Sequence, residues 1–261
     1  MILVTGHEGF LGNAISTYLT KNNIEHKTLE RETTYSIWCD TVKSLFKNNI
    51  FKTVIAAGAI SNNQYKSTDI FDWNAYAMDY LAHNCVRQNT HLIFISSQAA
   101  RNPETLYGHS KKMAELLLKA LPSLDLCILQ PFNIWGEGET CKLVHCQSLP
   151  HRLAVHNLEV LWDIQRDYVH VSDVVNAVML AKRYRTCGTY HVGTGTAIKS
   201  EPLSACVQWK GYKTEPTPDY IETYTCAEPE RFLPDWNPTV MVLSELSQLE
   251  EKMNSLKKNA N

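Results

Sequence analysis

No long apolar run occurs anywhere in the 261 residues of this chain. The apolar segment at the N-terminus, Met1 to Val4, ends at Thr5 and Gly6, whereas the apolar core of a signal peptide has roughly 7 to 15 residues. A membrane-spanning helix needs roughly 18. We therefore expect a chain without a membrane span, located in the cytoplasm.

The chain also has little net charge. Its 25 Lys and Arg residues nearly balance its 27 Asp and Glu residues, so the formal net charge is -2 at pH 7. Binding to nucleic acid or to an anionic lipid surface depends on a broad positive potential. Neither nucleic acid nor a membrane is therefore expected as a partner.

Paired cysteine motifs are missing as well. The eight cysteines lie singly between Cys39 and Cys226, and a chain of this length does not need disulfides to complete a core. The potential zinc ligands that lie closest together are Cys141, His145, Cys146 and His151. No second CxxC or HxxxH pair accompanies them, so we expect free thiols and no metal site.

The N-terminal half alternates short β-branched and apolar runs with segments of helical periodicity. The predicted strands are Ile2–Thr5, Ile24–Leu29, Thr53–Ala57, Leu92–Ile95 and Leu126–Gln130. The predicted helices are Asn13–Asn22, Val42–Lys47, Trp73–Gln88 and Ser110–Ala120. Such alternation predicts an α/β fold with a mostly parallel sheet and helices on both faces.

The pattern loosens after Pro131, and regular α/β character returns around Tyr168 to Ala181. An amphipathic helix is predicted from about Val242 to Leu256. We infer a large sheet domain formed by residues 1–135 with about 167–197. A small, irregular C-terminal lobe would comprise about 136–166 with 198–261.

The turn between the first strand and the first helix reads Thr5-Gly6-His7-Glu8-Gly9-Phe10-Leu11-Gly12. Glycines in such a turn allow a sharp bend, a close approach of a pyrophosphate to backbone N–H groups, and tight packing of helix on strand. The helix N-terminus favours phosphate charge. The turn predicts a dinucleotide site, although its glycine spacing differs by one residue from the usual G-x-G-x-x-G.

The end of the second predicted strand carries Glu30 and Arg31. A carboxylate about twenty residues after the glycine turn can accept hydrogen bonds from the adenosine ribose, which favours NAD. A guanidinium there can instead pair with the 2′-phosphate of NADP. We expect NAD, with NADP as the open alternative.

Tyr107 and Lys111 are four residues apart at the start of a predicted helix, so their side chains share one face. A tyrosine with a pKa of about 10 is a weak base at neutral pH, but a nearby ammonium favours the phenolate. The preceding strand ends in Ser96 and Ser97. We expect Lys111 to lower the pKa of Tyr107 towards a range useful for acid–base chemistry.

Together these motifs resemble the extended short-chain dehydrogenase/reductase superfamily, and in particular its NAD-dependent epimerase/dehydratase family of nucleotide-sugar enzymes. The similarity extends over nearly the whole chain. Besides the two motifs above, it rests on Asn74, Gln130–Gly136, Arg166–Asp173, Tyr190–Gly195 and Asp235–Pro238. The resemblance implies a Rossmann-type doubly wound sheet and a small substrate lobe.

The resemblance also implies roles for individual residues. Tyr107 would be the general acid/base, Lys111 would lower its pKa and hold the nicotinamide ribose, and Ser97 would bind the reacting oxygen. The residues implied to contact the cofactor are Gly6, Gly9, Phe10, Leu11, Gly12, Glu30, Arg31, Gly58, Ala59, Tyr107, Lys111 and Pro131. Asn133 and Arg166 would bind the diphosphate of a nucleotide-sugar substrate.

Three departures bear on the reaction. Gln98 and Ala99 stand where sugar 4,6-dehydratases of this kind carry Asp and Glu, which disfavours that elimination. The loop between Ser97 and Tyr107 is short, and Gln130 replaces a common arginine. We therefore expect an epimerase or a reductase. The resemblance also implies a homodimer. The alternative is a non-catalytic dinucleotide-binding regulatory subunit of the same fold.

Overall fold

The computed structural model describes residues 1–61, 67–139, 160–161, 164–205, 213–214 and 224–245. The chain forms two compact units. Unit 1 comprises Met1–Gln130 and Val175–Tyr190, and unit 2 comprises Pro131–Val174 and His191–Asn261. The candidate zinc ligands of residues 141–151, and most of the helix predicted from 242 to 256, lie outside the described residues.

Unit 1 is built around a six-stranded sheet with the order β2-β1-β3-β4-β5-β9. The strands are β1 (Ile2–Thr5), β2 (His26–Leu29), β3 (Thr53–Ala56), β4 (His91–Ile95), β5 (Leu126–Pro131) and β9 (Gly188–Val192). The pairings from β2 through β5 are parallel. Each connection between them must therefore cross over a face of the sheet.

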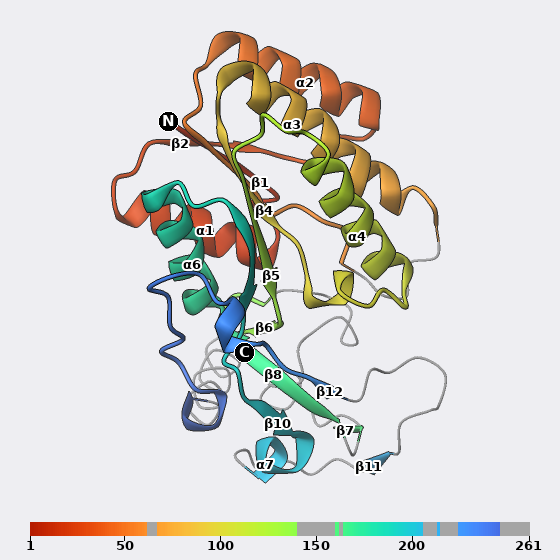
Figure 1. The fold of residues 1–261 in the computed structure, drawn as a ribbon, viewed down its shortest axis with the longest axis vertical. Coiled ribbons are helices and arrows are strands. Elements are labelled where there is room, and N and C mark those ends of the chain that lie inside the picture. The colour runs from red at the N-terminus through yellow and green to blue at the C-terminus, as the bar shows by residue number, and fades with distance from the viewer. Residues whose placement is uncertain (62–66, 140–159, 162–163, 206–212, 215–223, 246–261) are drawn as a thin grey trace, which may run out of the picture. The chain divides into compact units, whose positions relative to one another are not determined.

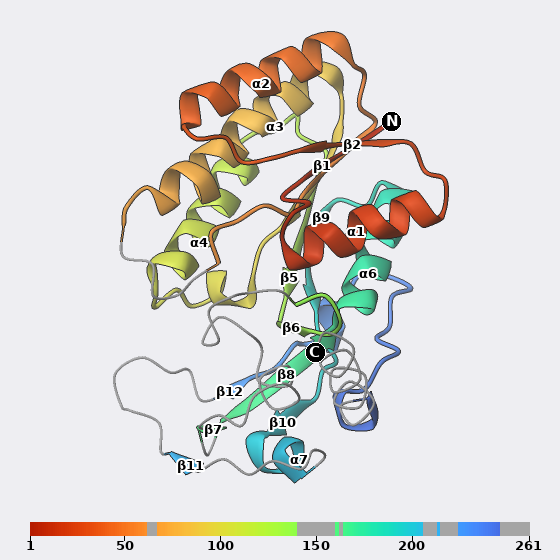
Figure 2. The same ribbon diagram turned by 180° about the vertical axis from the view of Figure 1, so that it is seen from behind.

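Helices cover both faces of this sheet. They are α1 (Phe10–Lys21), α2 (Tyr35–Asn48), α3 (Ala77–Gln88), α4 (Leu106–Lys119) and α6 (Val171–Tyr184). Figures 1 and 2 show α2, α3 and α4 on one face and α1 and α6 on the other. The predicted Rossmann-type, doubly wound α/β fold is confirmed.

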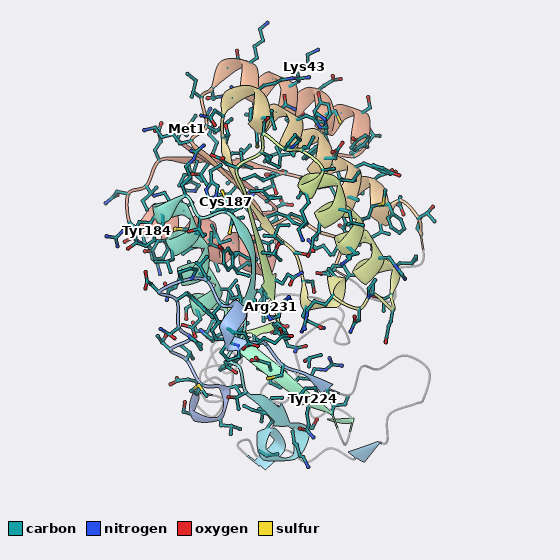
Figure 3. The ribbon with its side chains drawn as sticks, viewed as in Figure 1. Met1, Lys43, Tyr184, Cys187, Tyr224 and Arg231 are labelled. Carbon is teal, nitrogen blue, oxygen red and sulfur yellow. The ribbon has the colours of Figure 1, made fainter. Side chains whose placement is uncertain are left out.

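The sheet is buried because its central strands are apolar on both sides. All residues of β1, β3 and β4 are buried, which is why these strands appear in the sequence as continuous apolar runs. Helix α2 adds Trp38, Val42 and Phe46 to the same core, one turn apart along one face. Lys43, on its opposite side, points away from the sheet (Figure 3).

The strand order reverses between β1 and β3. The chain passes from β1 to β2 at one edge and then returns to the other side of β1 to form β3. In doubly wound sheets the ligand crevice lies outside the carboxyl ends of the strands at this point. The residues that follow β1 and β3, beginning with Gly6 and Ala57, are therefore positioned to meet a bound nucleotide.

Two helices begin earlier than their apolar periodicity predicts, because each has an N-cap. Helix α2 begins at Tyr35, after Thr34, whose side chain accepts a hydrogen bond from the Ile37 N–H. Helix α4 begins at Leu106, after Thr105, which accepts one from the Gly108 N–H. A threonine cap satisfies an N–H group that the first helical turn leaves without an acceptor.

The helix predicted over residues 73–88 is divided. A π-helical turn, η1 (Asp72–Tyr76), precedes α3, and Asn74 lies within it. Such turns insert an extra residue into a helix and often occur at functional sites. Here the turn lies on the same side of the sheet as α4.

Unit 2 contains a four-stranded sheet and a two-stranded sheet. In the larger, the order is β10-β8-β12, and β6 also pairs with β8. Its strands are β6 (Asn133–Trp135), β8 (Gln165–His170), β10 (Ala197–Lys199) and β12 (Tyr224–Thr225). The other pair is β7 (Val160–Leu161) with β11 (Lys213–Thr214), and the helical segments of this unit include α7 (Ser200–Ala205) and η4 (Pro229–Arg231).

Two buried carboxylates hold the loops of unit 2. Asp167 is fully buried and accepts hydrogen bonds from the N–H groups of Thr194, Gly195 and Ala227, at 2.7, 2.9 and 3.1 Å. Asp173 is equally buried and accepts bonds from the Thr239 and Val240 N–H groups. A buried charge persists where it is satisfied in this way.

Within the described part of the chain, no helix has the length and apolar character needed to cross a membrane.

Candidate active site

The glycine turn at the end of β1 brings two loops of unit 1 into close contact. Gly6 has φ +69°, and a Cβ added to it would lie 2.3 Å from the Cα of Gly58, in the loop after β3. A Cβ on Gly12 would lie 2.0 Å from the Gly6 carbonyl oxygen. Only glycine tolerates this conformation and these approaches without displacement. The exposed Ala59 follows Gly58 in the same loop.

The N-terminus of α1 fits a pyrophosphate. Gly9 is its N-cap and supplies no side-chain hydrogen bond, and the first turn has no acidic residue. A Cβ on Gly9 would meet one described atom within 4 Å, the Gly6 carbonyl oxygen at 3.3 Å, so this side of the turn is open. Open backbone N–H groups at the positive end of a helix are suited to phosphate oxygens.

The two residues expected to distinguish NAD from NADP have different partners. Glu30 is exposed, and its carboxylate lies 3.5 Å from the Nε2 atom of His7 in the glycine turn. The Arg31 guanidinium lies over the ring of Trp73, 5.7 Å from its centroid. Arg31 therefore has a cation–π partner within unit 1.

Ser97 and Tyr107, which are ten positions apart, share a hydrogen bond. Ser97 ends the loop after β4 and also accepts a bond from the Ala99 N–H, at 3.2 Å, as the N-cap of η2 (Gln98–Ala100). A Cβ on Gly108 would lie 2.7 Å from the Ala99 carbonyl oxygen. The glycine next to Tyr107 therefore allows α4 to pack closely on η2.

Lys111 lies one turn further along α4 and is buried, with 2% exposure. Its Nζ donates a 2.7 Å hydrogen bond to the Ile95 carbonyl oxygen and lies 4.7 Å from the centroid of the Phe94 ring. Burial lowers the pKa of Lys111 to about 7, and the charge of Glu115 acts in the opposite direction. Desolvation disfavours the ammonium in this way wherever a lysine leaves water.

The pKa of Tyr107 differs from the sequence-based expectation. Burial raises it above the ordinary value, while the hydrogen bond with Ser97 lowers it. The expected lowering by Lys111 is therefore not found, because desolvation of the phenolate outweighs the favourable contacts. Tyr107 is a neutral phenol at neutral pH.

Asn74 links the cofactor-side loop to α4. Its Oδ1 accepts a hydrogen bond from the Ile60 N–H at 2.8 Å, and its Nδ2 donates to the Ile60 carbonyl oxygen and to Ser110 Oγ. Ser110 in turn donates to the Tyr107 carbonyl oxygen at 2.8 Å. These bonds fix the loop after Gly58 relative to the helix that carries Tyr107.

The predicted residues from the later part of the chain lie in unit 2. Pro131 is buried at the end of β5. The Asn133 side chain donates to the Asp167 carbonyl oxygen at 2.8 Å and to Thr225 Oγ1 at 3.1 Å, so its amide N–H groups connect β6, β8 and β12. Arg166 lies on β8 opposite Ile198.

The sequence analysis missed one charged residue near the site. Glu115 is 2% exposed and lies one turn beyond Lys111 on α4. Its Oε1 accepts hydrogen bonds from Ser96 Oγ at 2.5 Å and from Gln130 Nε2 at 2.8 Å. The available signal was its spacing of eight from Tyr107, which places both residues on one helix face.

No group of three or more His, Cys, Asp or Glu side chains among the described residues could hold a metal ion.

A family model described as "NAD dependent epimerase/dehydratase family" matches residues 2–193, more than half of the sequence. The chain therefore belongs to this family, as its motifs predict. The family is NAD-dependent, which confirms a nicotinamide dinucleotide as the cofactor class. A comparison with curated proteins found no match.

Solved structures share the fold over nearly the full length. The Helicobacter pylori ADP-L-glycero-D-manno-heptose-6-epimerase is 18% identical, with TM-score 0.83 and coverage of 97% of this chain and 96% of that one. A Thermus thermophilus UDP-glucose 4-epimerase in complex with NAD is 19% identical, with TM-score 0.80 and coverage of 97% and 98%. The NDP-hexosamine 5,6-dehydratase TunA, described as NAD-dependent and involved in tunicamycin biosynthesis, is 19% identical, with TM-score 0.80 and coverage of 97% of both chains.

Proposed function

We propose that this protein interconverts an alcohol and a ketone on a nucleotide-activated sugar, as an NAD-dependent epimerase or reductase. The observation that carries the proposal is the hydrogen bond between Ser97 and Tyr107, with Lys111 one turn away on the same helix. The names of two similar structures, an ADP-heptose epimerase and a UDP-glucose epimerase, support the substrate class.

The three side chains have complementary roles in this proposal. When bound, the nicotinamide supplies the acceptor and donor of a hydride. Tyr107 as the neutral phenol donates its proton to the ketone oxygen during reduction, and the phenolate left behind accepts the hydroxyl proton during oxidation, while Ser97 binds the same oxygen. The raised pKa of Tyr107 keeps the phenol protonated at neutral pH, which is the state that reduction of a ketone requires. Lys111 holds the nicotinamide ribose.

The remaining cofactor contacts are assigned to the open glycine turn and the neighbouring loops. The proposed set is Gly6, Gly9, Phe10, Leu11 and Gly12 for the pyrophosphate, with Glu30, Gly58, Ala59 and Pro131 around the nucleosides. The stacking of Arg31 on Trp73 supports NAD over NADP, because the guanidinium then has a partner other than a 2′-phosphate.

Asn133 and Arg166 are the proposed ligands of the substrate diphosphate, and we assign substrate binding to unit 2. A guanidinium fork suits phosphate oxygens. We propose an epimerase or a reductase rather than a 4,6-dehydratase, because Gln98 and Ala99 cannot supply the acid and base of an elimination.

We also propose a homodimer. Tyr76 at the end of η1 and Leu116 on α4 are 44% and 60% exposed, and both lie on the helical face of unit 1 that includes α3 and α4 (Figure 1). Burial of such side chains against a second copy would remove apolar area from water. Light scattering after size-exclusion chromatography tests this, and a monomeric mass would contradict it. The cytoplasmic location stays a prediction.

The first experiment is to identify any dinucleotide that copurifies, from its absorbance and mass, and then to titrate the protein with NADH and NADPH. Retained NAD supports an epimerase, which keeps its cofactor through the cycle. Reversible binding of NADH to an empty protein supports a reductase. A protein that binds neither contradicts both enzymes, and the regulatory-subunit alternative loses its support as well.

The matched variant is Tyr107→Phe. Under the proposal it abolishes interconversion of UDP-glucose or another tested sugar nucleotide but leaves NADH affinity within about twofold, because the lost hydroxyl acts on the substrate. A wild-type protein that binds NADH but transforms no sugar nucleotide would instead favour the non-catalytic alternative.

A further inference from the structure

Three consecutive residues, the last of β4 and the two that follow it, each contact a different residue on one face of α4. The pairs are Ile95 with Lys111, Ser96 with Glu115, and Ser97 with Tyr107. Residues four apart lie one above the other on a helix. Glu115 is therefore the third residue in the row on α4 that also carries Tyr107 and Lys111. Like them, it contacts a residue at the end of β4 or just after it.

Glu115 is a buried carboxylate whose shortest hydrogen bonds come from uncharged donors. Its Oε1 accepts from Ser96 at 2.5 Å and from Gln130 at 2.8 Å. Its Oε2 lies 3.6 Å from the Nζ of Lys119, which is 47% exposed. Hydroxyl and amide donors stabilise the ionised carboxylate without cancelling its charge. Water around the exposed Lys119 weakens that ion pair.

We propose that Glu115 is a positioning residue for the site: its buried negative charge keeps the Lys111 side chain protonated and directed to the end of β4. The proposal rests on the function proposed for Lys111 above. Both side chains are 2% exposed, and a charge acts more strongly on a neighbour when water does not separate them. A neutral Lys111 would lose the charge that strengthens its proposed hydrogen bonds to the nicotinamide ribose.

Among the described residues, Lys119 is the charged side chain paired with Glu115, Tyr107 is the other titratable group on this face of α4, and Asp72 is the acidic residue of the neighbouring η1. Lys111 contacts the Phe94 ring and the Ile95 carbonyl oxygen of β4. Asn74 of η1 and the three residues of η2 carry no charge. Burial alone lowers the pKa of Lys111, and Glu115 is the charged group whose field raises it. Removal of this carboxylate should therefore neutralise Lys111.

The direct test is an NMR titration of protein labelled with carbon-13 at the lysine Cε, from about pH 5 to about pH 11. The Lys111 resonance is identified by its loss in Lys111→Met. In Glu115→Gln, which keeps the size and the hydrogen-bonding capacity of the side chain, the Lys111 midpoint should fall by about one unit or more. An unchanged midpoint would overturn the proposal.

Three further variants separate charge from structure. Ser96→Ala removes a hydrogen bond but keeps the carboxylate, and should move the Lys111 midpoint much less than Glu115→Gln does. Glu115→Asp retains the charge and should restore most of the wild-type midpoint. Gln130→Arg adds a positive charge beside Glu115 and should lower the midpoint, which keeps the proposal testable if Glu115→Gln does not fold. Equal effects of Ser96→Ala and Glu115→Gln would indicate a structural role and overturn it.

NADH affinity distinguishes failure of this inference from failure of the proposed function. A one-unit fall from a pKa of about 7 reduces the charged fraction of Lys111 at pH 7 roughly fivefold, and apparent affinity should fall in proportion. The loss should shrink below pH 6. If Lys111→Met binds NADH like the wild type, the proposed role of Lys111 is wrong. If Lys111→Met weakens binding but Glu115→Gln does not, the role of Glu115 is wrong.

Discussion

Substitution of Gly6 tests the contact between the two loops at the carboxyl ends of β1 and β3. Alanine at this position meets two obstacles in the structure. Its φ of +69° is a left-handed conformation, which costs a residue with a Cβ about 1–2 kcal/mol. Its Cβ would also lie 2.3 Å from the Gly58 Cα, where carbon atoms normally stay about 3.5–4 Å apart. Relief of such an overlap by backbone movement costs about 1–3 kcal/mol.

Gly138→Ala is the matched control, because Gly138 has φ +88° and no atom of the described residues lies within 4 Å of an added Cβ. Gly138→Ala should lower the unfolding free energy only by the cost of the left-handed conformation, about 1–2 kcal/mol. Urea unfolding should therefore show Gly6→Ala less stable than Gly138→Ala by about 1–3 kcal/mol. NADH fluorescence should show affinity reduced by about tenfold or more in Gly6→Ala alone, a loss of about 1.4 kcal/mol. Equal stability of the two variants, with wild-type NADH affinity in Gly6→Ala, would refute the reasoning.

Three other outcomes follow from polar groups that are buried or half-buried. Asp167→Ala removes a buried acceptor of three backbone N–H groups and should lower the unfolding free energy by about 3–5 kcal/mol. A decrease below about 1 kcal/mol, measured by urea unfolding, would contradict this. Burial lowers the pKa of His91 from 6.5 in the folded protein, so the unfolded chain binds the proton more readily than the folded protein does. The free energy that neutral His91 contributes to folding is fully present above pH 6.5. It is lost as the pH falls through the pKa of the folded state. Thermal melts should therefore show a smaller acid destabilisation for His91→Gln than for the wild type, and parallel pH profiles would argue against it. The hydrogen bond from Ser97 lowers the pKa of Tyr107, so Ser97→Ala should move the absorbance transition of the Tyr107 phenolate to higher pH. Tyr107→Phe serves as the spectral blank. A transition at unchanged pH would count against the hydrogen bond.

Local patterns were enough to predict much of the fold. The strands at Ile2, Thr53 and Leu92 were evident because both faces are buried and every position is apolar or β-branched. The start of α4 was predicted four residues late because the pattern of apolar positions does not mark the cap. Thr105 supplies that signal and could have been recognised from the preference for threonine at N-caps.

Part of the site was predictable for the same reason. A spacing of four brings Tyr107 and Lys111 to one helix face in any α-helix, so their alignment follows from the sequence. The direction of the pKa shift of Tyr107 could not be predicted from the sequence, because it depends on how deeply the fold buries the phenol. The partners of Arg31 and Glu115 were unpredictable too, since Trp73 and Gln130 lie 42 and 15 positions away along the chain.

The sequence by itself determined the order of strands and helices, the glycine turn, and the row of Tyr107 and Lys111, because each depends on contacts between near neighbours. The tertiary structure alone decided that Gly58 closes on Gly6, that Ser97 reaches Tyr107, and that neutral donors surround Glu115. Those contacts join segments from different strands and loops. Their distances and burial are set by how the sheet and its helices pack, which no local pattern of residues encodes.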